Sequence, residues 1–237
     1  MRDSWNPWRG DVSTRAVIFD FDETIIDLEP QHTAAHDALC RTMGVDYEEM
    51  PESFRKGSGR RIIDDIRDMR AHFDWRESKE TLFAIRQRFF DDACANAELI
   101  AMPGVVEAIR ALQERNITLA ITSSAVRASI EVILTRLGLR DAFPLIVDGS
   151  EVVNGKPDPE AYLLTARKLG IAAEDCVVIE DSHVGVVAAK RAGMFCIAVR
   201  NPRALIRQDL SAADVIVNSI TELLTDPDPR STPRPAE

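Results

Sequence analysis

The chain has 237 residues, of which 45% are hydrophobic, and its formal net charge is −10. This length and apolar content suffice for one large domain, or for a domain with a smaller one attached. The acidic balance argues against nucleic acid or an anionic membrane as a partner, because both are negatively charged, and no apolar stretch approaches the ~18 residues of a membrane-spanning helix. The four cysteines form no C-x-x-C pair, which favours buried thiols in a reducing cytoplasm.

The first predicted element is a short apolar run over residues 16–19, which ends in Asp20 and Asp22. A run rich in Val, Ile and Phe is typical of a strand buried on both faces, and residues i and i+2 of a strand point to the same side. Two neighbouring carboxylates at the end of such a strand are unfavourable unless a divalent cation, a lysine or a shared proton neutralises them. Each of these neutralisers indicates a chemical site.

Helical patterns dominate the next interval, from residue 27 to residue 100. Two amphipathic faces are predicted, one formed by Ile62, Ile66, Met69 and Phe73 and one formed by Leu82, Ile85 and Phe89. A helical insertion directly after the first strand is expected to stand over the C-terminal edge of the sheet, where open α/β sheets bind ligands. The alternative is a helical decoration packed elsewhere.

Apolar runs then alternate with helical patterns. The predicted strands cover residues 117–121, 145–147, 176–179, 195–199 and 215–217. The predicted helices include 105–112, 161–169 and 184–192, and the helix over 161–169 is expected to have Asp158 as its N-cap and Pro159 as its first residue. This alternation predicts an α/β fold, with a Rossmann-like parallel sheet core that carries helices on both faces.

The interval after the first strand is too long for a simple crossover, since parallel strands need little more than one connecting helix. We therefore expect a small α-helical cap domain, residues 27–100, inserted into a discontinuous core formed by residues 1–26 and 101–225. The Pro-rich polar tail, residues 226–237, is expected to be disordered.

Polar residues follow four of the predicted strands at their C-terminal ends. They are Asp20 and Asp22, the segment 122–124, Lys156 after a turn, and Glu180 with Asp181. Singly, the hydroxyl and acidic groups could cap the following helices, and the lysine could be a surface residue. Placed together, they favour phosphoryl transfer, in which one aspartate attacks phosphorus and its neighbour carries the proton. A lysine and a hydroxyl would bind the phosphate oxygens, and a hard cation such as Mg²⁺ would offset the charge repulsion.

The set resembles the haloacid dehalogenase superfamily, in the branch of β-phosphoglucomutase and phosphoglycolate phosphatase. The matching segments are D-F-D-E-T (20–24), T-S-S (122–124), G-K-P-D-P (155–159) and V-I-E-D-S-H-V-G-V (178–186). The match runs from about Arg15 to Leu224 and includes the helical interval. It implies a Mg²⁺-dependent enzyme that acts on a small phosphate ester.

The resemblance also implies roles for the acidic residues. Asp20 would be the nucleophile and a Mg²⁺ ligand. Asp22 would be the general acid/base, and its backbone carbonyl would bind the metal. Asp181 would be a further metal ligand, and Glu180 would act directly or through a bound water.

Roles for the phosphoryl site follow in the same way. The Thr122 hydroxyl would bind the phosphoryl group with the Ser123 backbone amide beside it, and Lys156 would bridge the nucleophile and the phosphate. In the cap, the segment K-G-S-G-R (56–60) resembles the part that closes on substrate, so that Arg60 is a candidate for binding a distal anionic group. His32 matches a position that is often histidine, and the alternative for both cap residues is a solvent-exposed side chain.

Two departures from the branch bear on the reaction. Glu23, a candidate substrate-binding residue, follows Asp22 where many members carry glycine, although some phosphatases of the superfamily share D-F-D-E-T. Its charge should discourage a highly anionic leaving group unless the side chain turns away. Ala125 and Val126 stand where mutase-like members place a Lys-Asn pair for a second phosphate. The prediction is a cytoplasmic Mg²⁺-dependent phosphatase of a small phosphorylated metabolite, as a monomer or weak dimer. The alternatives are a β-phosphoglucomutase-like mutase and a non-catalytic phospho-ligand-binding protein.

Overall fold

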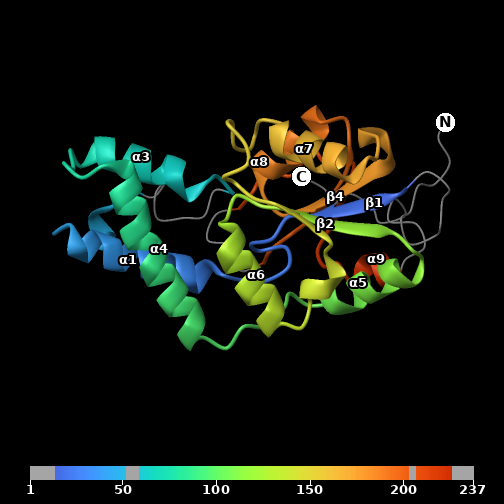
Figure 1. Ribbon diagram of the computed structural model, residues 1–237, viewed down its shortest axis with the longest axis horizontal. Coiled ribbons are helices and arrows are strands. Elements are labelled where there is room, and N and C mark those ends of the chain that lie inside the picture. The colour runs from blue at the N-terminus through green and yellow to red at the C-terminus, as the bar shows by residue number, and fades with distance from the viewer. Residues whose placement is uncertain (1–13, 52–58, 203–206, 226–237) are drawn as a thin grey trace.

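The chain builds one six-stranded sheet, in the order β3-β2-β1-β4-β5-β6, and every neighbouring pair of strands is parallel. The computed structural model describes residues 14–51, 59–202 and 207–225 (Figure 1). The strands are β1 (Ala16–Phe19), β2 (Thr118–Thr122), β3 (Leu145–Val147), β4 (Cys176–Glu180), β5 (Phe195–Val199) and β6 (Val215–Val217). The predicted α/β fold with a parallel sheet is confirmed.

Burial explains why the first apolar run becomes a central strand. All four residues of β1 are fully buried. Val17 and Phe19 belong to one apolar cluster, and Ala16 and Ile18 belong to another on the opposite face. A strand that is apolar on both faces is stable only inside a sheet covered on both sides, and β1 lies between β2 and β4.

Helices cover both faces of the sheet (Figure 1). One face is covered by α5 (Val105–Glu114), α6 (Arg127–Arg136) and α9 (Glu222–Thr225), and the other by α7 (Glu160–Leu169) and α8 (His183–Arg191). The described residues also include the short 3₁₀ turns η2 (Tyr47–Glu49), η3 (Arg140–Ala142) and η4 (Ala173–Asp175). Because all neighbouring strands are parallel, their carboxyl ends lie together at one edge of the sheet.

The start of α7 differs from the prediction by one residue. The helix begins at Glu160 with Pro159 as its N-cap, and not at Pro159 with Asp158 as the cap. The Asp158 side chain still accepts a hydrogen bond from the Glu160 backbone N–H at 2.9 Å. Because Pro159 has no N–H, the first free donor of the helix lies one position later.

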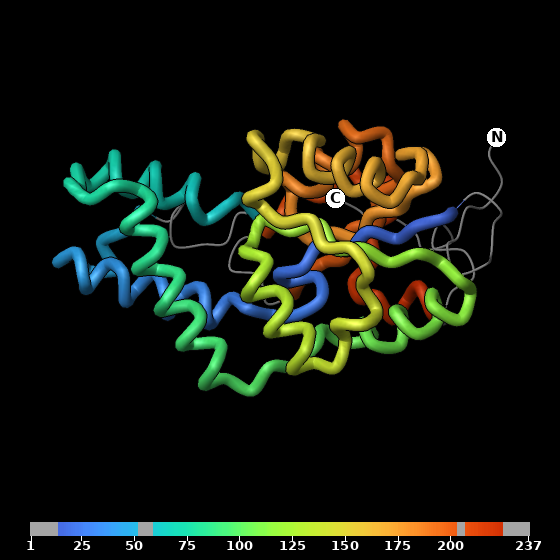
Figure 2. The backbone as a smooth tube through the Cα atoms, in the orientation of Figure 1, coloured from blue at the N-terminus to red at the C-terminus, as the bar shows by residue number. Residues whose placement is uncertain are grey.

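The interval after β1 forms a helical lobe, which we define as α1 (Glu29–Thr42), α3 (Ile62–His72) and α4 (Lys79–Asn96) with η2. The lobe has its own buried apolar cluster, formed by Leu39, Cys40, Met50, Ile66, Met69, Trp75 and Leu82. Figure 2 shows the chain leaving β1 into this lobe and returning through α4 to α5. The lobe lies beyond the carboxyl ends of the strands, on the side where the sheet edge is open (Figure 1).

The predicted apolar face of α4 is confirmed in part, since Leu82 is buried and Ile85 and Phe89 are partly buried against the apolar clusters. The fully buried residues of the helix are Leu82, Arg86, Phe90 and Cys94. The buried positions repeat every four residues, and the interruption of the apolar pattern by Arg86 hid this repeat in the sequence. On α3, the predicted face is confirmed, since Ile66 and Met69 are buried.

Some predictions fall outside the described residues, namely those on Lys56, Gly57 and Ser58 of the cap segment and on the tail. Within the part of the chain that the structure describes, no helix has the length and apolar character needed to cross a membrane.

Candidate active site

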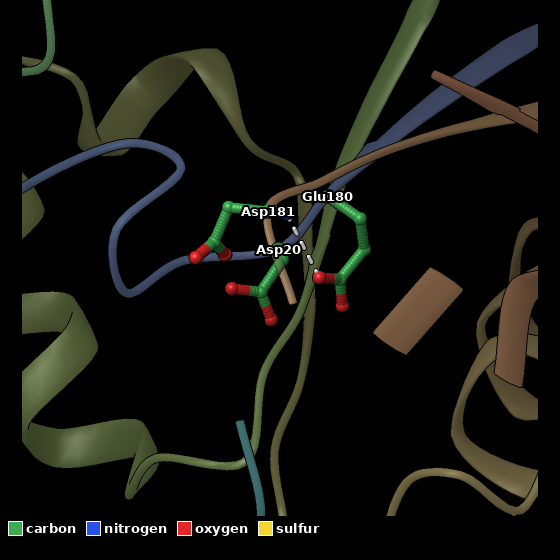
Figure 3. Close-up of side chains that lie close together, drawn as sticks. All are labelled: Asp20, Glu180 and Asp181. Carbon is green, nitrogen blue, oxygen red and sulfur yellow. Dashed lines mark hydrogen bonds between the residues drawn. The ribbon is translucent and has the colours of Figure 1, made fainter. Parts of the chain in front are cut away.

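The carboxyl ends of β1 and β4 bring three acidic side chains together. Asp20 follows β1, Glu180 ends β4 and Asp181 follows it, and Figure 3 shows the three side chains gathered at this edge. One carboxylate oxygen from each residue lies within 4.8 Å of those from the other two, and all three residues are buried. Parallel strands end at the same edge of a sheet, so this placement follows from the strand order β1-β4.

Lys156 enters this acidic group from the loop before α7. Its Nζ donates to Asp20 Oδ1 at 2.5 Å, to Glu180 Oε1 at 2.7 Å and to the Thr122 carbonyl at 3.3 Å. The lysine is almost fully buried. The predicted contact between Lys156 and Asp20 is present, and the catalytic roles of the two residues stay predictions.

The electrostatics of this group show an excess of negative charge. Burial raises the pKa of Asp20 to about 8, although Lys156 acts in the opposite direction. Burial, assisted by the charges of Glu180 and Asp20, raises the pKa of Asp181 well above its usual value. Burial also opposes ionisation of Glu180, but Lys156 holds the pKa of that carboxyl below its ordinary value. One ammonium thus faces three carboxylates, and the remaining charge favours a proton or a bound cation.

A hard divalent cation fits this set of donors, because Mg²⁺ prefers carboxylate and carbonyl oxygens. Asp20 and Asp181 are the carboxylates whose raised pKa values show that the lysine alone does not neutralise them. Glu180 differs from them, because hydrogen bonds engage both of its oxygens. Oε1 accepts from Lys156 and from the Tyr162 hydroxyl, and Oε2 accepts from the Ser182 hydroxyl and two backbone N–H groups. Glu180 is thereby the anchor that orients Lys156, and its role as a metal ligand stays a prediction.

The hydroxyl group predicted for phosphoryl binding lies beside a second hydroxyl. Thr122 Oγ1 is 2.6 Å from Thr165 Oγ1, and the Thr165 hydroxyl donates to the Ala161 carbonyl at 2.9 Å. The neighbouring backbone N–H of Ser123 donates to the Val147 carbonyl at 3.0 Å. The geometry does not support a phosphoryl contact for this amide, because the hydrogen bonding between β2 and β3 continues one residue past Thr122 and uses it.

Asp22 faces the helical lobe. Its Oδ1 is buried, finds no hydrogen-bond donor among the described residues and lies 3.7 Å from His32 Nε2. His32 Nδ1 is 2.5 Å from a guanidinium nitrogen of Arg86, which can only donate. This contact assigns the histidine proton to Nε2, on the side of Asp22, and the His32 ring also stacks on Phe90 at a centroid distance of 4.6 Å. His32, predicted as a substrate-binding residue, therefore lies beside the predicted acid/base.

Two arginines, Arg60 and Arg61, directly precede α3. Arg60 pairs with Asp68 at 2.8 Å and with Asp65 at 3.2 Å, both on α3. Arg61 pairs with Asp64 of α3 at 2.8 Å and also reaches the core, where its Nη1 donates to the Val152 carbonyl at 3.0 Å and to the Gly149 carbonyl at 3.4 Å. The binding of a distal anion by Arg60 stays a prediction, and Arg61 is a lobe-to-core contact that sequence analysis missed.

A hollow between the lobe and the core lies beside His32. It has an empty volume of about 270 Å³, partly open to solvent, and its lining includes His32, Phe90, Ala125 and Val126. Arg127, the next residue along the chain, donates to the Ile146 carbonyl at 2.6 Å and pairs with Glu151 at 2.5 Å. The positions where mutase-like members bind a second phosphate are thus apolar, and the adjacent cation is engaged elsewhere.

Two positioning contacts were not predicted. Tyr162 and Thr165 lie on one face of α7, three residues apart, and contact Glu180 and Thr122. The signal was present in the sequence, since a tyrosine and a threonine at i and i+3 directly follow the Lys156 motif on a helix that packs on the sheet.

Fold and site together define the class of the protein, an α/β enzyme with a buried acidic centre at the carboxyl ends of its strands. Residues 14–193 match the family profile described as a haloacid dehalogenase-like hydrolase. The chain belongs to the haloacid dehalogenase-like hydrolase family. The resemblance inferred from the sequence motifs is thereby confirmed.

Known relatives span nearly the whole chain. Hexitol phosphatase B of Escherichia coli (strain K12) is 32% identical over 217 residues, which cover 88% of this chain and 93% of that protein. β-Phosphoglucomutase of Bacillus subtilis (strain 168) is 28% identical over 218 residues, which cover 88% of this chain and 91% of that protein. The crystal structure of CbbY from Rhodobacter sphaeroides in complex with phosphate is 26% identical with a TM-score of 0.78, and the match covers 89% of this chain and 96% of that one.

Proposed function

We propose that the protein is a Mg²⁺-dependent phosphatase that hydrolyses a phosphorylated sugar or polyol through a phosphorylated Asp20. One observation carries the proposal: Asp20 Oδ1 is held by Lys156 at 2.5 Å, two residues before Asp22, whose Oδ1 has no hydrogen-bond donor in the described part of the chain. One carboxylate is oriented to attack, and the other is available to carry a proton.

In the first half of the reaction, a carboxylate oxygen of Asp20 attacks phosphorus while the bond from phosphorus to the leaving oxygen breaks. Lys156 holds Oδ1 of the nucleophile, which leaves the other oxygen to form the new bond. Asp22 donates its proton to the leaving alkoxide and becomes ionised. A bound Mg²⁺ would supply charge neutralisation between the anionic nucleophile and the phosphoryl group.

In the second half, the ionised Asp22 takes a proton from water, and the oxygen of that water attacks phosphorus. The bond between phosphorus and the Asp20 oxygen breaks, inorganic phosphate leaves, and both aspartates return to their starting states. Asp20 and Asp181, with the backbone carbonyl of Asp22, are the groups we propose to hold the cation. We further propose that the helical lobe is part of the cap domain predicted over residues 27–100 and closes over this site in a cytoplasmic enzyme.

The apolar positions at Ala125 and Val126 favour hydrolysis over mutase chemistry. A mutase must bind a bisphosphate at both ends and reorient it, which calls for cationic or amide groups at a second phosphate site. Here these residues line the hollow between lobe and core, and Arg127 is engaged by Glu151. The names of the relatives, a hexitol phosphatase and a β-phosphoglucomutase, support a carbohydrate-type phosphate ester as the substrate class.

The test is phosphate release from an aryl phosphate and from a panel of sugar and polyol phosphates, with Mg²⁺ and with EDTA. We expect hydrolysis that EDTA and Asp20→Asn abolish. Conversion of glucose 1-phosphate to the 6-phosphate faster than phosphate release would favour the mutase. Inactivity towards the whole panel would favour a phospho-ligand-binding protein.

A further inference from the structure

We propose that Glu23 is a positioning residue, whose carboxylate braces the turn that carries Asp22 against both the helical lobe and the core. The inference rests on the proposed function only in giving Asp22 its role as acid/base. It replaces the predicted contact of Glu23 with substrate by a structural role in the orientation of Asp22.

The backbone conformation of Glu23 is unusual for a residue other than glycine. Its φ angle is +61°, in the left-handed region that glycine adopts readily and that other residues adopt under strain. Many members of the branch that the sequence resembles carry glycine here. The chain keeps a glutamate in a glycine-like conformation, which needs compensation from side-chain contacts.

The first contact joins Glu23 to the lobe. Oε1 accepts hydrogen bonds from the backbone N–H groups of Leu28 and Glu29, each at 3.1 Å. These donors belong to the first turn of α1, where Leu28 is the N-cap and provides no side-chain cap. A carboxylate at a helix N-terminus satisfies free N–H groups and interacts favourably with the helix dipole. Glu23 therefore caps α1 from outside the helix, together with Asp27, whose Oδ1 also accepts from the Glu29 N–H at 3.2 Å.

The second contact joins Glu23 to the core. Oε2 accepts a hydrogen bond from the side-chain amide of Asn201, which follows β5. One carboxylate thus links three parts of the chain: the turn after Asp22, the first helix of the lobe, and a loop of the sheet core. The backbone N–H of Glu23 also donates to the Ile26 carbonyl at 2.7 Å, which closes the turn on itself.

The brace lies where the lobe is connected to the core. The two connecting segments run side by side, since Ile26 forms a bridge with Ala101 and the Met102 N–H donates to the Ile25 carbonyl at 2.8 Å. Any rotation of the lobe about these connections moves the N-terminus of α1 relative to Glu23. A carboxylate that holds both α1 and Asn201 opposes such a rotation.

The orientation of α1 also determines what lies beside Asp22. His32 is on the first turns of α1, and its Nε2 is 3.7 Å from Asp22 Oδ1. By fixing the start of α1, Glu23 fixes the position of His32 relative to the acid/base. Without the brace, α1 and its histidine are expected to sample several positions relative to Asp22.

The test measures the lobe-to-core distance and catalysis in the same variants. The four native cysteines are buried, so spin labels can be attached to cysteines introduced at two exposed positions, Ala84 on α4 and Arg167 on α7. Pulsed electron paramagnetic resonance of the full chain then reports the distance distribution. The variants are Glu23→Gly, which introduces the residue that many members of the branch carry, and Asn201→Ala, which leaves the hydrogen bonds between Glu23 and α1 in place.

Glu107→Gln is the matched control, because Glu107 is an exposed carboxylate in the first turn of another helix, α5. We expect a broader distance distribution for both brace variants, a roughly tenfold lower kcat for Glu23→Gly, and wild-type behaviour for the control. A lower melting temperature with an unchanged distance distribution and kcat would make Glu23 a simple helix cap and overturn the proposal. If the wild type itself hydrolyses no phosphate ester, the proposed function fails, while the distance distributions still decide whether Glu23 is a brace.

Discussion

Replacing Tyr162 by phenylalanine removes one buried hydroxyl that binds Glu180, the residue that orients Lys156. The Tyr162 side chain is fully buried, and its hydroxyl donates to Glu180 Oε1 at 2.8 Å. The ring remains in the variant, so no large cavity forms. A hydrogen bond to a charged group contributes about 1.5–3 kcal/mol, and Lys156 still donates to the same oxygen at 2.7 Å. We therefore expect a loss near the lower end, about 2 kcal/mol, or roughly a 30-fold change in the folding constant.

Urea unfolding of Tyr162→Phe measures this loss, provided that the m value is unchanged. A double-mutant cycle with Glu180→Gln isolates the pair, and we expect a coupling energy of about 1–2 kcal/mol. A loss of stability below about 0.5 kcal/mol, the size of an ordinary surface substitution, would refute the reasoning. It would mean that the hydroxyl does not donate to an ionised Glu180.

Three further predictions concern the lysine, a buried histidine and the lobe contact. Lys156→Met should lower kcat/KM about 100-fold or more, because Asp20 and the phosphoryl group lose their cation; wild-type kinetics would contradict the assigned contact. Burial, with smaller contributions from the charges of Arg86 and His32, lowers the pKa of His36 well below 6.5. Below pH 6.5 only the unfolded chain binds a proton at this histidine, so the free energy of unfolding should decline as the pH falls. The decline should be steeper than in His36→Gln by up to about 1.4 kcal/mol per pH unit. Equal slopes for the wild type and His36→Gln would refute this prediction. Arg61→Ala should raise KM more than it lowers kcat, because the lobe loses its hydrogen bonds to Gly149 and Val152, and an unchanged KM would exclude a role in lobe closure.

The strands were predictable from the sequence because their burial is two-sided. Apolar runs such as 145–147, 195–199 and 215–217 have the same bounds in the sequence pattern and in the structure. The order of polar residues at the strand ends then placed Asp20, Lys156 and the acidic pair after β4 at one edge, since parallel strands end together. These inferences depend on local patterns and topology alone.

The facing of side chains on the lobe could not be predicted in the same way. Arg60 and Arg61 are adjacent and chemically identical, and both pair with aspartates of α3, yet Arg61 also donates to a carbonyl of the core. Arg86 is a charged residue at a buried position of α4, and its partner His32 lies 54 residues away. No local pattern could therefore have predicted its burial. The contact between Glu23 and Asn201 likewise forms only in the folded chain, because the two residues are far apart in the sequence. Such contacts depend on how the helices and strands pack together, and a short segment of sequence carries no information about that packing.

The central claim is that Asp20 becomes covalently phosphorylated during turnover. Rapid acid quenching of the full-length enzyme during turnover of a phosphate ester labelled at phosphorus, followed by peptide mapping, tests it directly. We predict label on the peptide that contains Asp20, its loss in Asp20→Asn, and its accumulation in Asp22→Asn if that variant still attacks but hydrolyses slowly. Phosphate release by the wild type with no labelled peptide, or label that persists in Asp20→Asn, would contradict the account.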